Sequence, residues 1–118
     1  MNSIPGYLLN DQNREVLAYL EGKSCHSDIV EPINQVIRHY PEVHSYCADR
    51  VNFSYTCWYK DQTIIAFAIG MGNVYFRLPN MANLPDVLTD APKAGPHWYA
   101  VDWQSPYLEI LLRAALNA

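Results

Sequence analysis

The sequence predicts an α+β fold of two layers, with an antiparallel sheet of about four strands and helices packed on one face of the sheet. The spacing of apolar residues is helical near the amino end, alternates from Asn52 onward, and is helical again at the carboxyl end. The connections at residues 60–62 and 71–73 are too short for a crossover helix, so the strands that they join are antiparallel. A chain of 118 residues suits one domain and is too short for two. We therefore expect a single domain, residues 1–118, with the order α-α-β-β-β-α-β-α.

Two helices are predicted near the amino end. Asn10 or Asp11 can cap the first, because such side chains accept hydrogen bonds from the free N–H groups of a first turn, and Gly22 is placed to end it. Asp28 and Glu31 have the spacing of a capping box for the second. The apolar residues have helical spacing, namely Val16, Leu17 and Leu20 in the first helix and Ile29, Ile33, Val36, Ile37 and Tyr40 in the second.

Strands and a last helix follow. Segments rich in β-branched and aromatic residues predict three strands, FSYTCWY, TIIAFAIG and VYFRLP. A helical turn is expected around residues 84–89, and a loop rich in Pro and Gly then leads to a fourth strand, HWYAVDW. Ser105 and Pro106 supply an N-cap and a first-turn proline for the last helix. The buried side of that helix is predicted to hold Tyr107, Leu108, Leu111, Leu112 and Ala115.

The second hairpin predicts which side chains share a face of the sheet. A turn at residues 71–72 or 72–73 pairs odd residues with even ones. The expected core face then holds Ile65, Phe67, Ile69, Val74, Phe76 and Leu78. The opposite, open face is expected to hold Ala66, Ala68, Tyr75 and Arg77.

The first hairpin leaves two registers open, because its loop has no glycine to set the turn type. A three-residue loop buries Cys57 and places Thr56 and Trp58 on the open face. A two-residue loop at residues 61–62 does the reverse and turns Tyr59 outward, together with Tyr55 and Cys57. We favour the first register because it matches more apolar partners.

Charge and composition bound the partners and the compartment. Eight Lys and Arg stand against 12 Asp and Glu, a net charge of −4, and no basic run is present, so nucleic acid is disfavoured. Three cysteines without a framework spacing are typical of reduced thiols, and we expect a cytoplasmic protein. Met1 to Leu9 has neither the positive charge nor the apolar run of a secretory signal, and no apolar segment approaches ~18 residues, so we expect no membrane span.

The sequence offers candidate residues for a metal site and for a thiol-based catalytic site. His39, His44 and Cys47 form the best metal-like cluster, but a structural zinc site needs a fourth ligand and none is evident, so we expect no metal and no cofactor. A small enzyme that uses Cys57 with His97 or Asp102 is an alternative reading, since a thiol nucleophile needs a base within hydrogen-bond reach. Nothing in the sequence places these residues side by side.

The aromatic residues favour a binding function. Nine Tyr, three Trp and three Phe exceed what so short a chain needs for its core. The predicted strands carry Trp58, Tyr75, Arg77 and Trp98, which belong to the residue types that dominate binding hot spots. We expect a non-enzymatic binding domain that uses an aromatic sheet face and the cleft beside it. A homodimer is the favoured occupant of that face, and a small-molecule ligand, a protein partner or the chain's own helices are the alternatives.

One resemblance accompanies this reading. The segment CWYKDQTIIAFAIGMGNVYFRLP, followed by GPHWYAVDW and a closing helix, resembles the small α+β domains of the MmcQ/YjbR-like group and their TfoX N-terminal-like relatives. The similarity covers roughly Phe53 to Leu116. In those domains, a strand meander with a residue at the position that Arg77 occupies here precedes a strand that carries tryptophan. The resemblance implies a DNA-binding-like or unknown role and supplies no catalytic residue.

Overall fold

The computed structural model describes residues 4–47, 54–79 and 86–117 of the chain. These residues form three α-helices, α1 (Arg14–Leu20), α2 (Glu31–Ile37) and α3 (Leu108–Leu116). They also form four short 3-10 helices, η1 (Gly6–Leu8), η2 (Asp11–Asn13), η3 (Ser27–Val30) and η4 (Pro92–Ala94). Six strands complete the α+β fold: β1 (His44–Cys47), β2 (Thr56–Lys60), β3 (Thr63–Ile69), β4 (Asn73–Arg77), β5 (Thr89–Asp90) and β6 (Trp98–Asp102). None of the described helices is long and apolar enough to cross a bilayer.

The strands form one antiparallel sheet with the order β1-β2-β3-β4-β6-β5. The predicted meander is confirmed as β2, β3 and β4, and β6 is the predicted fourth strand. The sheet is wider than expected because β1 and β5 add a short strand at each edge. β5 occupies the end of the helical turn predicted at residues 84–89, of which residues 84 and 85 lie outside the described part. Phe53, the expected start of the first strand, also lies outside it.

The β3–β4 hairpin differs from the expected register. Phe67 lies opposite Tyr75, so odd residues pair with odd ones and the loop holds the three residues 70–72. Gly70 adopts a φ of 72°, a left-handed conformation that glycine tolerates at little cost. The prediction that Phe67 and Phe76 share a face is therefore wrong, because the extra loop residue reverses the pairing. Tyr75 instead shares a face with Phe67.

The β2–β3 hairpin combines both registers that the sequence left open. Its loop consists of the two residues 61–62, as in the second register. Cys57 nevertheless lies opposite Phe67 and shares a face with it, as the three-residue loop of the first register predicts. A β-bulge between these points shifts the pairing by one residue. The extra residue is Ile65, which packs with Trp58 in the core on one face, whereas Phe67 belongs to the core on the other.

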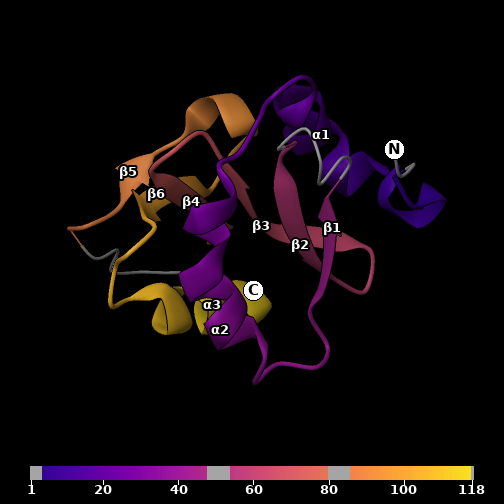
Figure 1. Cartoon of the computed structure of the whole chain (residues 1–118). Coiled ribbons are helices and arrows are strands. Elements are labelled where there is room, and N and C mark those ends of the chain that lie inside the picture. The colour runs from indigo at the N-terminus through magenta and orange to yellow at the C-terminus, as the bar shows by residue number, and fades with distance from the viewer. Residues whose placement is uncertain (1–3, 48–53, 80–85, 118) are drawn as a thin grey trace.

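Helices cover both faces of the sheet, which corrects the expectation of helices on one face. Figure 1 shows α2 and α3 together below the sheet and α1 at its opposite end. The core on the α2 and α3 side includes Trp58, Ala66 and Phe76. The core on the α1 side includes Leu20 and Phe67. Because side chains alternate along a strand, the central strands contribute residues to both cores, and neither of their faces is left open.

The expected ends of α1 are confirmed, whereas α3 begins later than expected: its N-cap is Tyr107 and its first residue is Leu108, so Ser105 and Pro106 lie in the turn before it. The Asn10 side chain accepts a hydrogen bond from the Asn13 amide at 3.1 Å, which starts the η2–α1 segment, and Gly22 follows its end with a φ of 77°. The Ser105 hydroxyl accepts from the Tyr107 amide at 3.1 Å. The first hydrogen bond satisfies an N–H group that a first helical turn leaves free, and the second holds the turn that precedes α3.

The start of α2 is built differently from the predicted capping box. The His26 side chain, through Nδ1, accepts a hydrogen bond from the Asp28 amide at 3.2 Å. This contact caps η3, which runs directly into α2. The two residues of the predicted capping box instead lie within the helical run, Asp28 in η3 and Glu31 as the first residue of α2.

Candidate ligand-binding cleft

The predicted binding residues do not share one accessible face. Trp58 is completely buried, because its strand position points toward α2, where its indole Nε1 donates to the Asn34 side-chain oxygen at 3.3 Å. This hydrogen bond satisfies the polar end of a buried ring. Trp58 therefore serves the core between sheet and helix, and the surface expected around it is absent from this part of the described chain.

Tyr75, Arg77 and Trp98 lie on the opposite face from Trp58. Arg77 is paired directly with Trp98, and Phe67 stacks on Tyr75 with ring centroids 4.5 Å apart. Trp98 is only 5% exposed, so little of its ring is available to a partner. Burial raises the pKa of the Tyr75 phenol above its ordinary value. A cleft of about 350 Å³ adjoins Tyr75 at the edge of this face.

The structure does not bring Cys57 together with His97 or Asp102. Two strands separate β2 from β6, which amounts to ~14 Å at ~4.8 Å per strand. His97 is exposed, and Asp102 accepts a hydrogen bond from the Gln104 amide at 2.8 Å. Burial, with a smaller contribution from Cys47, raises the pKa of the Cys57 thiol to about 12. A buried thiol held in its neutral form is a poor nucleophile.

His44 and Cys47 do not share a metal site either. They stand three residues apart in β1, so their side chains point to opposite faces of the sheet. His44 lies opposite Tyr59, whereas Cys47 lies opposite Thr56. In the described ranges, no group of three or more His, Cys, Asp or Glu side chains has the arrangement of a metal site.

A cleft of about 880 Å³ lies where the amino-terminal segment meets the β2–β3 loop and the start of β1. Its walls carry three rings, Tyr7, His44 and Tyr59. Tyr59 is the central ring, with its centroid 5.8 Å from that of Tyr7 and 5.7 Å from that of His44. Tyr59 itself is only 7% exposed, whereas Tyr7 is 49% exposed and His44 is also exposed, so Tyr59 supports the two rings that a ligand can reach. Tyr7 and His44 therefore form an exposed aromatic surface at this edge of the sheet, with residues other than those that the sequence predicted.

The two phenols of this cleft are joined by a hydrogen bond of 2.7 Å between their hydroxyl oxygens. That bond, followed by burial, raises the pKa of Tyr59 to about 12. A tyrosine of ordinary pKa is already protonated at neutral pH, and the raised pKa makes Tyr59 still less able to release its proton. This favours a role in holding a ligand over a role in proton transfer.

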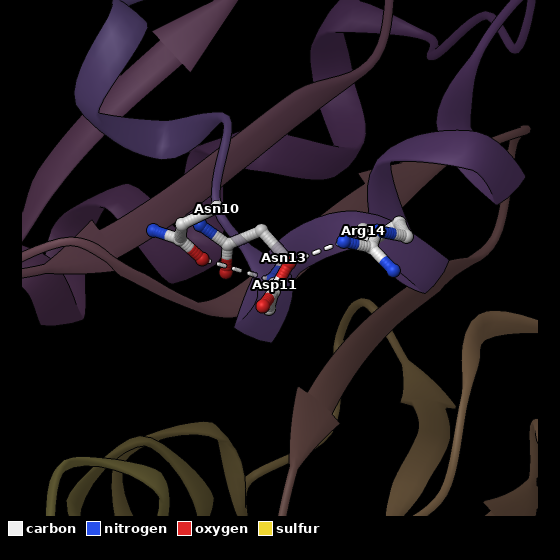
Figure 2. A network of polar contacts seen from close by, with 4 residues as sticks. All are labelled: Asn10, Asp11, Asn13 and Arg14. Carbon is white, nitrogen blue, oxygen red and sulfur yellow. Dashed lines mark hydrogen bonds and ion pairs between the residues drawn. The ribbon is translucent and has the colours of Figure 1, made fainter.

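Asn13 holds the amino-terminal wall of the cleft in place. It is only 1% exposed, and its side-chain amide donates to the backbone oxygens of Leu8 at 2.9 Å and Gln62 at 2.8 Å. Its side-chain oxygen accepts from the Ile64 amide at 3.0 Å. One amide thus connects η1 to both sides of the β2–β3 loop. Figure 2 shows Asn13 beside Asn10, whose side-chain oxygen points toward it.

Carboxylates rim the cleft. Asp11, Glu42 and Asp61 line it, and no Lys or Arg is among its lining residues. Asp11 forms an ion pair with Arg14, which is drawn in Figure 2. Within the part of the chain that the structure describes, no ion pair involves Glu42 or Asp61. The cleft therefore combines aromatic rings with two carboxylates, Glu42 and Asp61, that form no ion pair within the described residues.

Comparisons with protein families, with curated proteins and with solved structures found no match for this chain. The resemblance to MmcQ/YjbR-like and TfoX N-terminal-like domains therefore stays a prediction. The function has to be argued from the cleft itself.

The sequence missed this cleft because its parts are far apart along the chain. Tyr7 and Tyr59 are separated by 52 positions, and nothing local predicts that they meet. The one available signal was the second register of the first hairpin, which turned Tyr59 outward. The two-residue loop of that register is present, and it places Asp61 beside the rings.

Proposed function

We propose that the protein is a small, non-enzymatic binding domain that holds a compact organic cation in the cleft of Tyr7, His44 and Tyr59. The observation that carries this proposal is the combination of these rings with the carboxylates of Glu42 and Asp61 and with the absence of Lys and Arg from the lining. Ring faces attract cations through their quadrupole, and carboxylates attract them by charge. A guanidinium or ammonium group matches both features.

The expected affinity is modest because the cleft is open to water. A cation over an exposed ring gains about 0.5–1 kcal/mol, and an exposed ion pair gains about 0.2–1 kcal/mol. Contacts of this size favour a ligand that uses several of them at once. The guanidinium of an arginine side chain has a planar face for the exposed rings of Tyr7 and His44 and edge donors for carboxylates, so it suits this site better than an ammonium does.

Hydrogen bonds hold the walls of the cleft in place, which favours ligand binding. Asn13 fixes the amino-terminal wall, and the hydroxyl of Thr63 donates to the Gln12 side chain at 2.5 Å on the same wall. Walls that are already in position cost little ordering on binding. The cleft therefore does not need to assemble around its ligand.

The experiment compares two probes of the same shape by calorimetry. Acetyl-arginine amide carries the cation, and acetyl-citrulline amide replaces the guanidinium by a neutral urea. We expect the first to bind and the second to bind at least several-fold more weakly. Equal binding of the two probes, or no binding of either, would refute the proposal.

Variants then test whether the carboxylates of the cleft contribute to binding of the cation. The double variant Glu42→Gln and Asp61→Asn removes both unpaired carboxylates, and Asn keeps the left-handed φ of 52° that Asp61 adopts. Loss of two exposed ion pairs predicts binding about 2- to 30-fold weaker. The matched control is Glu21→Gln with Asp86→Asn, which makes the same chemical changes at exposed positions outside the cleft. The control should bind as the wild type does.

Two sequence predictions belong with this proposal. We propose a homodimer, in which the surface around Tyr75 and Arg77 on the face opposite Trp58 takes part. We also propose a cytoplasmic location, for which the free thiols of Cys25, Cys47 and Cys57 are the supporting observation.

A further inference from the structure

A second pocket, of about 320 Å³, lies on the other face of β1 from the cation cleft. Two thiols line it, Cys25 and Cys47, together with polar side chains that include Asn34, Ser45 and Thr56. Both thiols are free. Two free thiols therefore line the same pocket.

The backbone brings the two cysteines together from distant segments. Cys47 ends β1 opposite Thr56, and its thiol donates to the backbone oxygen of Ser54 at 3.7 Å. Ser54 in turn forms an isolated antiparallel bridge with Ser24, the neighbour of Cys25. The segment of Cys25 is thereby held against the end of the strand that Cys47 contacts.

The segment of Cys25 is also fixed on its other side. Cys25 forms an isolated parallel bridge with Gly70. The Gly70 amide donates to the Ser24 oxygen at 2.7 Å, and the His26 amide donates to the Gly70 oxygen at 2.9 Å. These backbone hydrogen bonds leave Cys25 little freedom to leave the pocket.

The third cysteine is excluded from this pocket by the sheet. Cys57 belongs to the core on the α1 face, whereas Cys25 belongs to the core on the α2 and α3 face. Of the two pocket thiols, Cys47 is the more accessible, because Cys25 is only 5% exposed and Cys47 is half-buried. Burial, followed by the nearby Cys47, raises the pKa of Cys25 to about 11.

We propose that Cys25 and Cys47 are a modification site at which a low-molecular-weight disulfide forms an intramolecular disulfide bond. The inference goes beyond cation binding and does not depend on it. The bond would join the connection between α1 and η3 to the edge strand β1 and would close the pocket between them. Cys57 would stay a thiol.

The reaction balances with a small disulfide, R–S–S–R, as the oxidant. The Cys47 thiolate attacks one sulfur of R–S–S–R, which forms a mixed disulfide at Cys47 and releases one RS⁻. Cys25 then loses its proton to solvent, in a slow step because burial raises its pKa to about 11, and its thiolate attacks the Cys47 sulfur, which releases the second RS⁻. Two protein thiols are oxidised by two electrons in total, and one R–S–S–R is reduced to two thiols. The order follows exposure, since Cys47 is the thiol that the reagent can reach.

The experiment treats the full chain with excess oxidised glutathione and maps the product without reduction. The three cysteines fall in separate tryptic peptides, residues 24–38, 39–50 and 51–60. We expect the intact protein to lose the mass of two hydrogen atoms and peptides 24–38 and 39–50 to become linked. Cys57 should be alkylated only after the chain is unfolded.

Variants separate the two steps. Cys25→Ser should stop at a glutathione adduct on Cys47, and Cys47→Ser should stay unmodified. Cys57→Ala is the control and should give the wild-type linkage. If the Cys57→Ala variant does not fold, the peptide map of the wild-type chain shows by itself whether Cys57 takes part in the bond.

Four results would overturn the proposal. They are a wild-type chain that stops at the adduct on Cys47, a bond that includes Cys57, a bond between two chains, and no modification at all. Each of these results is distinguished by mass and by the linked peptides, and none of them bears on the cation cleft.

Discussion

Replacing Asn13 with alanine should destabilise the protein more than any other single change of a polar side chain near the cleft. The substitution removes the donor to the Leu8 oxygen and the acceptor of the Ile64 amide, two buried contacts. The Gln62 oxygen keeps a second donor, the Asn10 side chain, at 2.9 Å. Two buried groups without partners cost about 1–3 kcal/mol each, so we expect a loss of about 2–6 kcal/mol.

Urea unfolding followed by circular dichroism measures this loss. The matched control is Asn10→Ala, which removes a cap and hydrogen bonds that are exposed or part-buried and should cost about 1 kcal/mol. A cost for Asn13→Ala no larger than that for Asn10→Ala would refute the view that Asn13 joins the amino-terminal wall to the β2–β3 loop.

The variant Asn13→Asp adds a pH dependence. It keeps the acceptor for the Ile64 amide but turns a carboxylate oxygen toward two carbonyl oxygens, those of Leu8 and Gln62. Burial and this contact should raise the pKa of the new carboxyl in the folded state above the unfolded value of about 4. The penalty relative to wild type is then absent below that unfolded value, grows as pH rises, and is complete above the folded pKa. A difference from wild type that does not change between acidic and neutral pH would contradict this.

Three further predictions concern other parts of the molecule. Gly70→Ala should cost about 1–2 kcal/mol in urea unfolding, because the φ of 72° disfavours a Cβ; Gly72→Ala, which meets nothing within 4 Å and has no positive φ, is the control and should cost less. Tyr7→Phe should lower the pKa of Tyr59 from about 12 toward its ordinary value in an ultraviolet pH titration, because the hydrogen bond is its largest cause; an unchanged pKa would assign the shift to burial. Sedimentation at tens of micromolar should give twice the mass of 13.5 kDa if the proposed homodimer forms, and a strict monomer would exclude it there.

Local patterns predicted much of the fold. Asn10 and Gly22 lie at the helix ends that their side chains and backbone preferences indicate, whereas Ser105 lies in the turn before α3. The alternating segments became β2, β3, β4 and β6. These features depend on neighbours a few residues away, which a single sequence contains.

The parts that were missed depend on contacts between distant segments. The register between β3 and β4 differs from the predicted one because the loop holds one more residue than expected. One residue of that loop, Gly70, forms a bridge with the distant Cys25. β1 is a short edge strand with no alternating apolar pattern, so nothing local predicts it. Trp58 was read as a surface residue because the covering helix α2 could not be placed from the strand sequence. Its burial moved the candidate site to Tyr59 and the rings beside it.

The most direct test of the cation cleft is a titration of the isotope-labelled protein with acetyl-arginine amide, followed by nuclear magnetic resonance. The account predicts that the backbone amides of His44, Tyr59 and Gln62 shift in a saturable way and that acetyl-citrulline amide leaves them unchanged. Shifts that centre on Tyr75 instead, or that both probes cause equally, would contradict it.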